Sequence, residues 1–190
     1  MIGPVLTGEL VALRPVETRD AGPLARASRD PETQRLTGIV KNMTDAQWQQ
    51  WVDEGAESPT RVDYAMTSLM PNGDGAMSDE CIGEIVIDNI DPVNRSASLR
   101  LQSLPEFRGR GYGREAISLV VSYVFATPPQ GLGLHRLSLE VLAINPRARM
   151  LYESLGFVQE GVLRDAGRDG EHWCDVVVMS LLEDDIDLPE

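Results

Sequence analysis

The chain has 190 residues, of which 42% are hydrophobic and 25% are charged, and its formal net charge is -13. These values are typical of one domain with a complete hydrophobic core. We therefore expect a single domain over residues 1–190, with a solvated acidic tail at 183–190. A charge this negative repels phosphate-rich surfaces, which disfavours nucleic acid and anionic membranes as partners. It would attract a cationic partner; the alternative is that the acidic residues merely keep the protein soluble.

The sequence gives no signal for a membrane span, a disulfide framework or a metal site. No apolar run approaches the ~20 residues that cross a bilayer, and no basic segment leads into a long apolar one near Met1. Cys81 and Cys174 lie outside any Cys-x-x-Cys pair, and neither His135 nor His172 has a ligand cluster near it. We expect a cytoplasmic protein with reduced cysteines and no metal.

The first half of the chain alternates strand and helix signals. A strand at residues 10–14 ends at Pro15, and a helix from Asp20 stops before Pro31. A capping box at Thr44-Asp45-Ala46-Gln47 opens a second helix. Strands are then predicted at residues 62–69, 81–87 and 97–102, with turns at 71–75 and 91–94.

The second half contains one strand-loop-helix-strand unit. A largely apolar helix at residues 115–125 is stopped by Pro128-Pro129, and a strand follows at 135–142. Asn145-Pro146 opens another helix that ends at Gly156, and strands begin at residue 157 and at residue 176. The sum is an α/β (α+β) domain with one mixed, mostly antiparallel sheet of about seven strands, flanked by helices.

The segment Arg108-Gly109-Arg110-Gly111-Tyr112-Gly113, called the glycine loop below, has the pattern of an anion site. Its glycines let the backbone turn tightly, so that N–H groups converge with the N-terminus of the next helix and can bind phosphate. Arg108, Arg110 and Arg114 would add charge-assisted hydrogen bonds. Three arginines around one loop in so acidic a chain favour phosphate binding over a solvated turn.

A different phosphate motif also matches this segment. Residues 111–116 fit the dinucleotide fingerprint G-x-G-x-x-G/A, so a nicotinamide-dependent oxidoreductase is one alternative. A Rossmann domain would place that fingerprint after the first strand of a long series, whereas here it lies past mid-chain. No Gly-Lys-Ser/Thr follows the loop, which argues against a Walker loop.

The chain resembles the GNAT superfamily of N-acetyltransferases in two motifs. The glycine loop is similar to the family's Gln/Arg-x-x-Gly-x-Gly/Ala pyrophosphate loop. Residues 139–157 are similar to its second motif, which runs from a strand through an Asn to a helix with a Tyr and ends in Gly-Phe. Four further segments resemble the RimJ/RimL-like branch, which acetylates ribosomal-protein N-termini: Leu13-Arg14-Pro15, Leu104-Pro105-Glu106 and residues 161–165 and 169–173.

This resemblance implies the GNAT fold, with a sheet splayed at its centre, and acetyl-coenzyme A as the acetyl donor. The pyrophosphate would bind at the glycine loop, and the pantetheine would pair with the strand before it. Family members often have Trp or Tyr where this chain has Gln102. Asn145 would face the cofactor arm, cap its helix, or do both. The residues expected to bind the cofactor are Gln102, Ser103, Leu104, Arg108, Gly109, Arg110, Gly111, Tyr112, Gly113, Arg114 and Asn145.

The resemblance also assigns catalytic roles. Tyr152 matches the family tyrosine that protonates the departing thiolate; its alternative role is to pack its helix on the sheet. A phenol with a reference pKa of ~10 can donate a proton to sulfur. The acceptor amine must lose a proton before it attacks, and Glu84 and Glu140 are the candidate bases. We expect Glu115 to cap its helix and to balance the arginines.

The expected reaction is direct attack by a primary amine on the acetyl group, through a tetrahedral intermediate. The acceptor would be a protein N-terminus or a small cationic amine. A non-catalytic acyl-coenzyme A binding module is the main alternative. Trp48 and Trp51 would either pack in the core or form an aromatic wall for the acceptor. The sequence leaves the oligomeric state open, and a homodimer is one arrangement.

Overall fold

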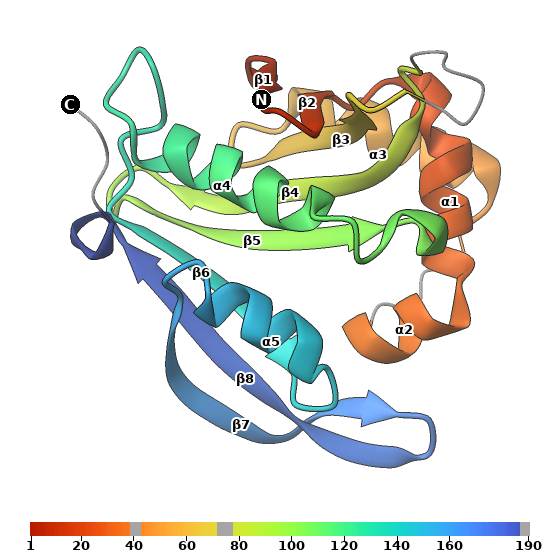
Figure 1. The fold of residues 1–190 in the computed structure, drawn as a ribbon, viewed down its shortest axis with the longest axis vertical. Coiled ribbons are helices and arrows are strands. Elements are labelled where there is room, and N and C mark those ends of the chain that lie inside the picture. The colour runs from red at the N-terminus through yellow and green to blue at the C-terminus, as the bar shows by residue number, and fades with distance from the viewer. Residues whose placement is uncertain (39–42, 72–77, 187–190) are drawn as a thin grey trace.

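The computed structural model describes residues 1–38, 43–71 and 78–186 (Figure 1). Of the turn expected at 71–75, residues 72–75 lie outside the described residues. The strands are β1 (Leu6–Thr7), β2 (Val11–Pro15), β3 (Val62–Ser68), β4 (Cys81–Asp91), β5 (Ser96–Ser103), β6 (Arg136–Leu142), β7 (Val158–Asp169) and β8 (His172–Leu182). The α-helices are α1 (Ala21–Arg29), α2 (Pro31–Thr37), α3 (Asp45–Glu57), α4 (Tyr112–Phe125) and α5 (Pro146–Glu153).

The strands form one eight-stranded sheet in the order β1-β2-β3-β4-β5-β6-β8-β7. The additional strand beyond the seven expected is the two-residue β1. Only β5 and β6 pair in parallel among the described strands, and α4 connects them, as the predicted strand-loop-helix-strand unit requires. The α/β fold with a mixed, mostly antiparallel sheet is therefore confirmed.

The sheet opens between β5 and β6, where the resemblance predicts a splay. Their pairing stops at Ser98 opposite Ser138, although β5 continues to Ser103 and β6 to Leu142. Figure 1 shows the consequence, because β5 and the β6–β8 arm diverge toward the end of the sheet where α2 lies. One irregularity in the β4–β5 register, between Asp88 and Asp91, lies near the point where the strands separate.

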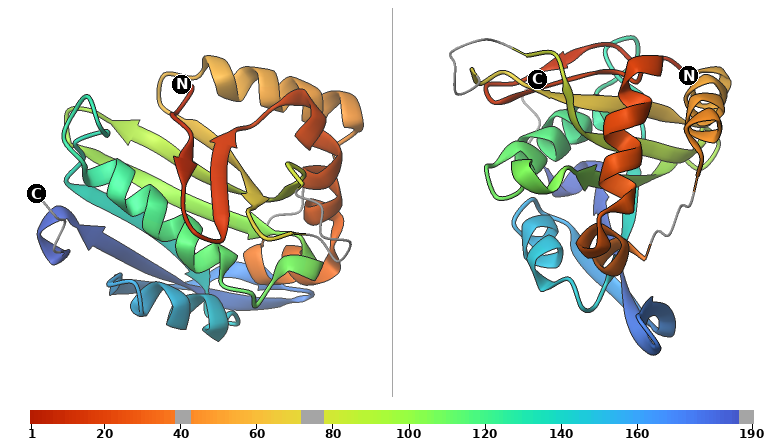
Figure 2. Two further views of the ribbon diagram at one scale, coloured as in Figure 1. Left: turned by 45° about the horizontal axis from the view of Figure 1, so that its top comes forward. Right: turned by 90° about the vertical axis from the view of Figure 1, so that its right-hand side faces the viewer.

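The main core lies between the sheet and α4, with α5 packed on the same face (Figure 2). Buried positions of α4 such as Ile117 and Val120 meet alternate residues of β2 to β6, in agreement with the apolar helix predicted there. A smaller cluster packs α1 and α3 on the other face of β3 and β4. It consists of Leu24, Ala25, Trp48, Ala65 and Cys81. Trp48 is fully buried in this cluster, so its role is core packing.

The capping box at Thr44 and Gln47 is present, and both of its hydrogen bonds are made. The sequence prediction missed α2, because Pro31 was treated only as a stop. Pro31 also begins the next helix: the Asp30 side chain accepts the Thr33 N–H at 2.8 Å, and proline needs no acceptor in the first turn. The helix α4 begins at Tyr112, three residues before the position predicted, so the end of the glycine loop is already helical.

The acidic C-terminal segment is tied down where it begins. Glu183 contacts Arg95 at 2.7 Å and His135 Nδ1 at 2.8 Å, so the expected solvated tail does not start at this residue. His172 is the first residue of β8. In the part of the chain that the structure describes, no helix has the length and apolarity to cross a membrane.

Candidate active site

A cavity of about 1120 Å³ opens where β5 and β6 separate. Pockets for small molecules measure ~300–1000 Å³, so this one suits a long or large ligand. Residues of β4 to β8, the glycine loop, α2 and α5 line it. Predicted site residues in its lining are Gln102, Ser103, Arg108, Gly109, Gly111, Gly113, Arg114, Glu140, Asn145 and Tyr152. Glu84, Leu104, Arg110 and Tyr112 lie outside the lining.

The glycine loop has the conformation of an anion cradle. Gly109 and Gly111 have φ angles of 77° and 91°, in the left-handed region that glycine adopts without strain. Gly111 is the N-cap of α4 and has no side chain to cap the first N–H groups of the helix. These N–H groups have no acceptor within the helix, so an anion from outside can accept them, assisted by the helix dipole.

The backbone of β5 borders the gap at alternate residues. The Leu104 N–H donates to the Ile82 carbonyl of β4 at 2.9 Å, so residues of the same parity, including Gln102, direct their amides toward β4. Leu101 and Ser103 therefore direct theirs toward the gap. Leu104 is fully buried and its N–H is bonded to β4, so the amides of β5 that border the gap here are those of Leu101 and Ser103. Sequence analysis did not single out Leu101, because this parity depends on strand register.

The side chains of Gln102 and Glu84 are joined behind the cavity wall. They are opposite one another on β5 and β4, and Gln102 Nε2 donates to Glu84 Oε1 at 2.9 Å. Both are buried, but only Gln102 lines the cavity. Glu140 on β6 is exposed and lines the cavity directly. The two candidate bases thus differ in access: Glu140 lines the cavity, whereas Glu84 lies behind Gln102 and would need a water to exchange a proton with a ligand.

Arg108 fastens the glycine loop to α2. Its guanidinium contacts Asp30 Oδ2 at 2.8 Å and Glu32 Oε2 at 2.5 Å. Burial alone would raise the pKa of Asp30, but hydrogen bonds from Arg108 and Thr33 outweigh it and hold that pKa below its usual range. The charge of Arg108 is therefore already engaged within the protein, and its contacts hold the wall formed by α2.

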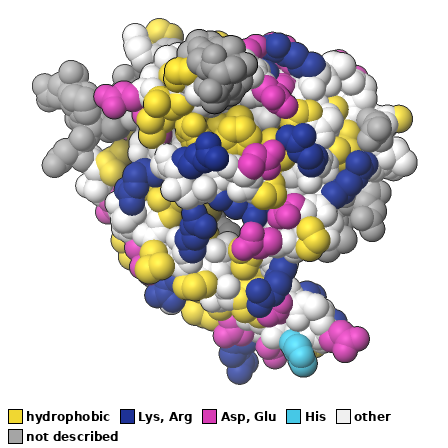
Figure 3. Space-filling model, turned by 45° about the vertical axis from the view of Figure 1, so that its right-hand side comes forward, with side chains coloured by type: hydrophobic (Ala, Val, Ile, Leu, Met, Phe, Trp, Pro, Cys, Tyr) yellow, Lys and Arg dark blue, Asp and Glu magenta, His cyan; other side chains and the backbone are white. Residues whose placement is uncertain are grey.

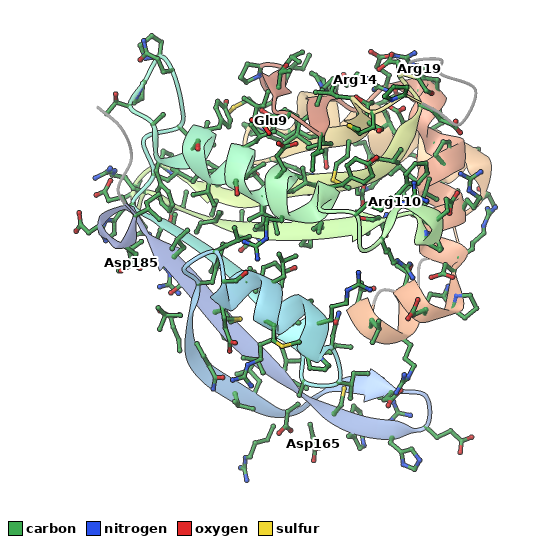
Figure 4. The ribbon with its side chains drawn as sticks, viewed as in Figure 1. Glu9, Arg14, Arg19, Arg110, Asp165 and Asp185 are labelled. Atoms are coloured by element: carbon green, nitrogen blue, oxygen red, sulfur yellow. The ribbon has the colours of Figure 1, made fainter. Side chains whose placement is uncertain are left out.

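The other arginines of the loop are less engaged. Arg110 is exposed on the loop before α4, with its guanidinium 5.6 Å from the Phe107 ring (Figure 4). Arg114 donates to the hydroxyl of Ser154, a neutral partner. Sequence analysis missed a further arginine, Arg147, which lines the cavity beside Gly109. The sequence did carry a signal for Arg147. A cation in the first turn of a helix is destabilised by the helix dipole, so its presence there indicates a compensating interaction.

Two residues of the site connect it to neighbouring elements. Asn145 caps α5 by accepting the Ala148 N–H at 3.1 Å, and its amide donates to the Leu36 carbonyl of α2 at 3.3 Å. Tyr112 is buried, with its hydroxyl 3.0 Å from Ser68 Oγ, so its side chain supports the loop from behind. Both positions therefore have structural roles in addition to any contact with a ligand.

Tyr152 lies on α5 and borders the cavity. Its ring packs edge-to-face on Phe157, with centroids 5.8 Å apart. Burial raises the pKa of Tyr152 to about 12. The phenol therefore keeps its proton at neutral pH, as a proton donor must.

Glu115 has a different role from the one expected. Its carboxylate accepts the N–H groups of Glu9, Leu10 and Val11 at 2.7–2.8 Å, which holds the turn between β1 and β2 against α4. The carboxylate is therefore turned toward this turn and does not balance the loop arginines.

A parallel strand pair that splays over a large cavity, with a glycine loop and a helix N-terminus beside it, is the arrangement that the resemblance to the N-acetyltransferases implies. The family model described as "Acetyltransferase (GNAT) domain" matches residues 11–158. The chain belongs to this family, and its enzyme class is that of the acyltransferases that act on amines.

Named relatives agree with this class. A spermidine N(1)-acetyltransferase of Vibrio cholerae is 34% identical over 102 residues, which is 54% of this chain and 57% of that protein. YdaF of Bacillus subtilis, named for ribosomal N-acetylation, is 29% identical over 67% of this chain and 74% of its own length. The crystal structure of spermidine N-acetyltransferase from Vibrio cholerae with CoA and spermine superimposes with a TM-score of 0.80. The superposition covers 92% of this chain and 96% of the Vibrio cholerae chain, and the two are 22% identical in sequence.

Proposed function

We propose that the protein transfers the acetyl group of acetyl-coenzyme A to a primary amine of a small cationic molecule. The observation that carries the proposal is the cavity in the splay, which has the first turn of α4 at its edge and Tyr152 on its wall. The names of the spermidine N-acetyltransferases similar to this chain support a polyamine-like acceptor. A net charge of -13 would attract such a cation.

The residues present fit coenzyme A. The N–H groups of α4 and the free amides of Leu101 and Ser103 offer hydrogen bonds to a diphosphate and to a pantetheine arm, respectively. Bound acetyl-coenzyme A would supply the acetyl group as an activated thioester. A backbone N–H of β5 aimed into the gap would polarise the thioester carbonyl, as an oxyanion hole does.

The remaining chemistry is two proton transfers. The acceptor amine loses a proton to Glu140, or to Glu84 through a water, and attacks the acetyl carbon to give a tetrahedral intermediate. When that intermediate collapses, Tyr152 donates its proton to the departing sulfur. The cavity lining includes residues of both faces of the splayed sheet, which would let donor and acceptor enter from different sides.

A protein N-terminus is the second candidate acceptor. The resemblance to the RimJ/RimL-like branch and the similarity to YdaF favour it. The decisive experiment measures thiol release from acetyl-coenzyme A with a panel of polyamines, other small cationic amines and short peptides with free N-termini. We expect turnover with polyamine-like amines. Turnover with peptides alone would reassign the acceptor, and tight binding without any turnover would leave a non-catalytic module.

Substitution of Arg108 should mainly change stability, whereas substitution of Arg110 should mainly change the affinity for acetyl-coenzyme A. Arg108→Ala should lower the free energy of unfolding by about 1–2 kcal/mol, because it breaks the contacts with Asp30 and Glu32. Arg110→Ala should leave the melting temperature unchanged and weaken acetyl-coenzyme A binding about fivefold, because this exposed side chain has no described ion pair. Calorimetric titration and thermal unfolding of both variants test this. Equal effects of the two substitutions on affinity and stability would contradict it.

A further inference from the structure

Most arginines in the structure have an acidic partner. Ion pairs engage Arg14, Arg19, Arg26, Arg35, Arg61, Arg95, Arg100, Arg108, Arg136 and Arg149. Within the described residues no ion pair is formed by Arg110, Arg114 or Arg147, and all three surround the glycine loop. Arg164 and Arg168 on β7 also form none with a described residue; Arg168 lines the same cavity, but its guanidinium lies over the Trp173 ring, 4.4 Å from the centroid. In a protein of net charge -13, three unneutralised cations at one place indicate an anionic ligand with more than one charged group.

Arg147 is set apart from the other two by its position. It comes from the first turn of α5, and its Nη2 lies 2.9 Å from where a Cβ on Gly109 would be. The guanidinium therefore packs against the backbone at the start of the glycine loop, whereas the first N–H groups of α4 lie at its end. A side chain on residue 109 would displace it. Arg147 is exposed and lines the cavity, so it stands at the mouth. Figure 3 shows dark blue side chains around a hollow in this side of the molecule.

We propose that Arg147 binds the 3′-phosphate of coenzyme A and makes the enzyme prefer coenzyme A to its dephospho form. This rests on the proposed function, because it assumes that coenzyme A occupies the cavity. The diphosphate takes the N–H groups of α4, and the pantetheine arm extends into the splay. The nucleotide end of the molecule then lies at the mouth, where its ribose phosphate needs a cation. Arg147 is the cation that the cavity lining offers there beside Gly109.

A thermodynamic cycle between the arginine and the phosphate tests this. Dissociation constants are measured by calorimetry for coenzyme A and for 3′-dephospho-coenzyme A, with the wild type and with Arg147→Gln. We expect the wild type to bind coenzyme A about tenfold more tightly than the dephospho form, and this preference to vanish in the variant. Affinity for dephospho-coenzyme A should be the same in both proteins.

The matched control is Arg149→Gln, on the same helix, where Arg149 is ion-paired with Glu153 at 2.8 Å. It should keep the wild-type preference, and thermal unfolding should show both variants folded. If Arg147→Gln weakens both ligands by the same factor, or leaves the preference intact, the proposal is overturned. If the wild type binds neither ligand, the proposed function itself fails, and the two failures are thereby distinguished.

Discussion

Tyr152→Phe is expected to lower kcat by about 10²–10³-fold and to leave the dissociation constant of acetyl-coenzyme A within about twofold of the wild-type value. The substitution keeps the ring, and with it the edge-to-face contact with Phe157 at 5.8 Å, so α5 should stay in place. Only the phenolic proton is removed. Without it the thiolate must leave unprotonated or take its proton from water. Steady-state kinetics and calorimetry on one preparation measure both quantities.

The control for this prediction is Tyr123→Phe. Tyr123 lies on α4, half-buried and edge-to-face with Tyr64 at 6.4 Å, and does not line the cavity. We expect it to retain the wild-type kcat. A wild-type rate in Tyr152→Phe would remove Tyr152 from the mechanism. An equal loss in the two variants would show that the effect is one of packing.

The pH dependence of the rate follows from the same burial. Because the pKa of Tyr152 is raised to about 12, the phenol keeps its proton as pH rises through the neutral and mildly alkaline range. The fraction of acceptor amine without a proton increases over that range. We therefore expect kcat/KM to rise with pH and to show no decline from loss of the acid well below pH 12. A pH–rate profile that falls with an apparent pKa near 10 would assign the acid to an ordinary, exposed phenol.

Local signals in the sequence predicted the parts of the fold that depend on neighbouring residues. The Thr44–Gln47 capping box and the Asn145 cap both begin the helices expected of them. The helix α2 depends on local chemistry too, but Pro31 both ends one helix and begins the next, and only the first meaning was used. The splay at the centre of the sheet was expected from family resemblance and had no local signal.

The side chains of the site were harder to predict, because their roles depend on residues distant in sequence. Arg108 was expected to bind an anion from its place in the loop, yet its acidic partner Asp30 is 78 residues earlier in the chain. The sequence named Leu104 and not Leu101, because only the bond to Ile82 fixes which amides of β5 border the gap. Arg147 is brought to Gly109 by tertiary packing alone. Residue types were thus predictable, whereas their partners required the fold.

Gly83→Ala is expected to lower the free energy of unfolding by about 2–3 kcal/mol and to weaken acetyl-coenzyme A binding at least about tenfold. Gly83 lies on β4 opposite Ser103, and a Cβ there would be 2.4 Å from the Gln102 carbonyl oxygen and 2.9 Å from Ser103 Cα. Both are backbone atoms of β5, so the contact is relieved only if the strand moves. The strand that moves is the one whose amides border the gap. Chemical denaturation and calorimetric titration measure the two effects.

Gly161→Ala is the control, because it makes the same change where there is room. Gly161 lies on β7, and a Cβ there would meet nothing within 4 Å. Alanine loses less backbone entropy than glycine on folding, so this variant should gain about 0.5–1 kcal/mol of stability and bind acetyl-coenzyme A normally. The opposite signs of the two stability changes separate steric displacement of β5 from any general effect of replacing glycine. If Gly83→Ala folds and binds as the wild type does, the close approach of β4 and β5 does not position the cofactor strand. The backbone of Leu101 and Ser103 would then lose its place in the proposed site.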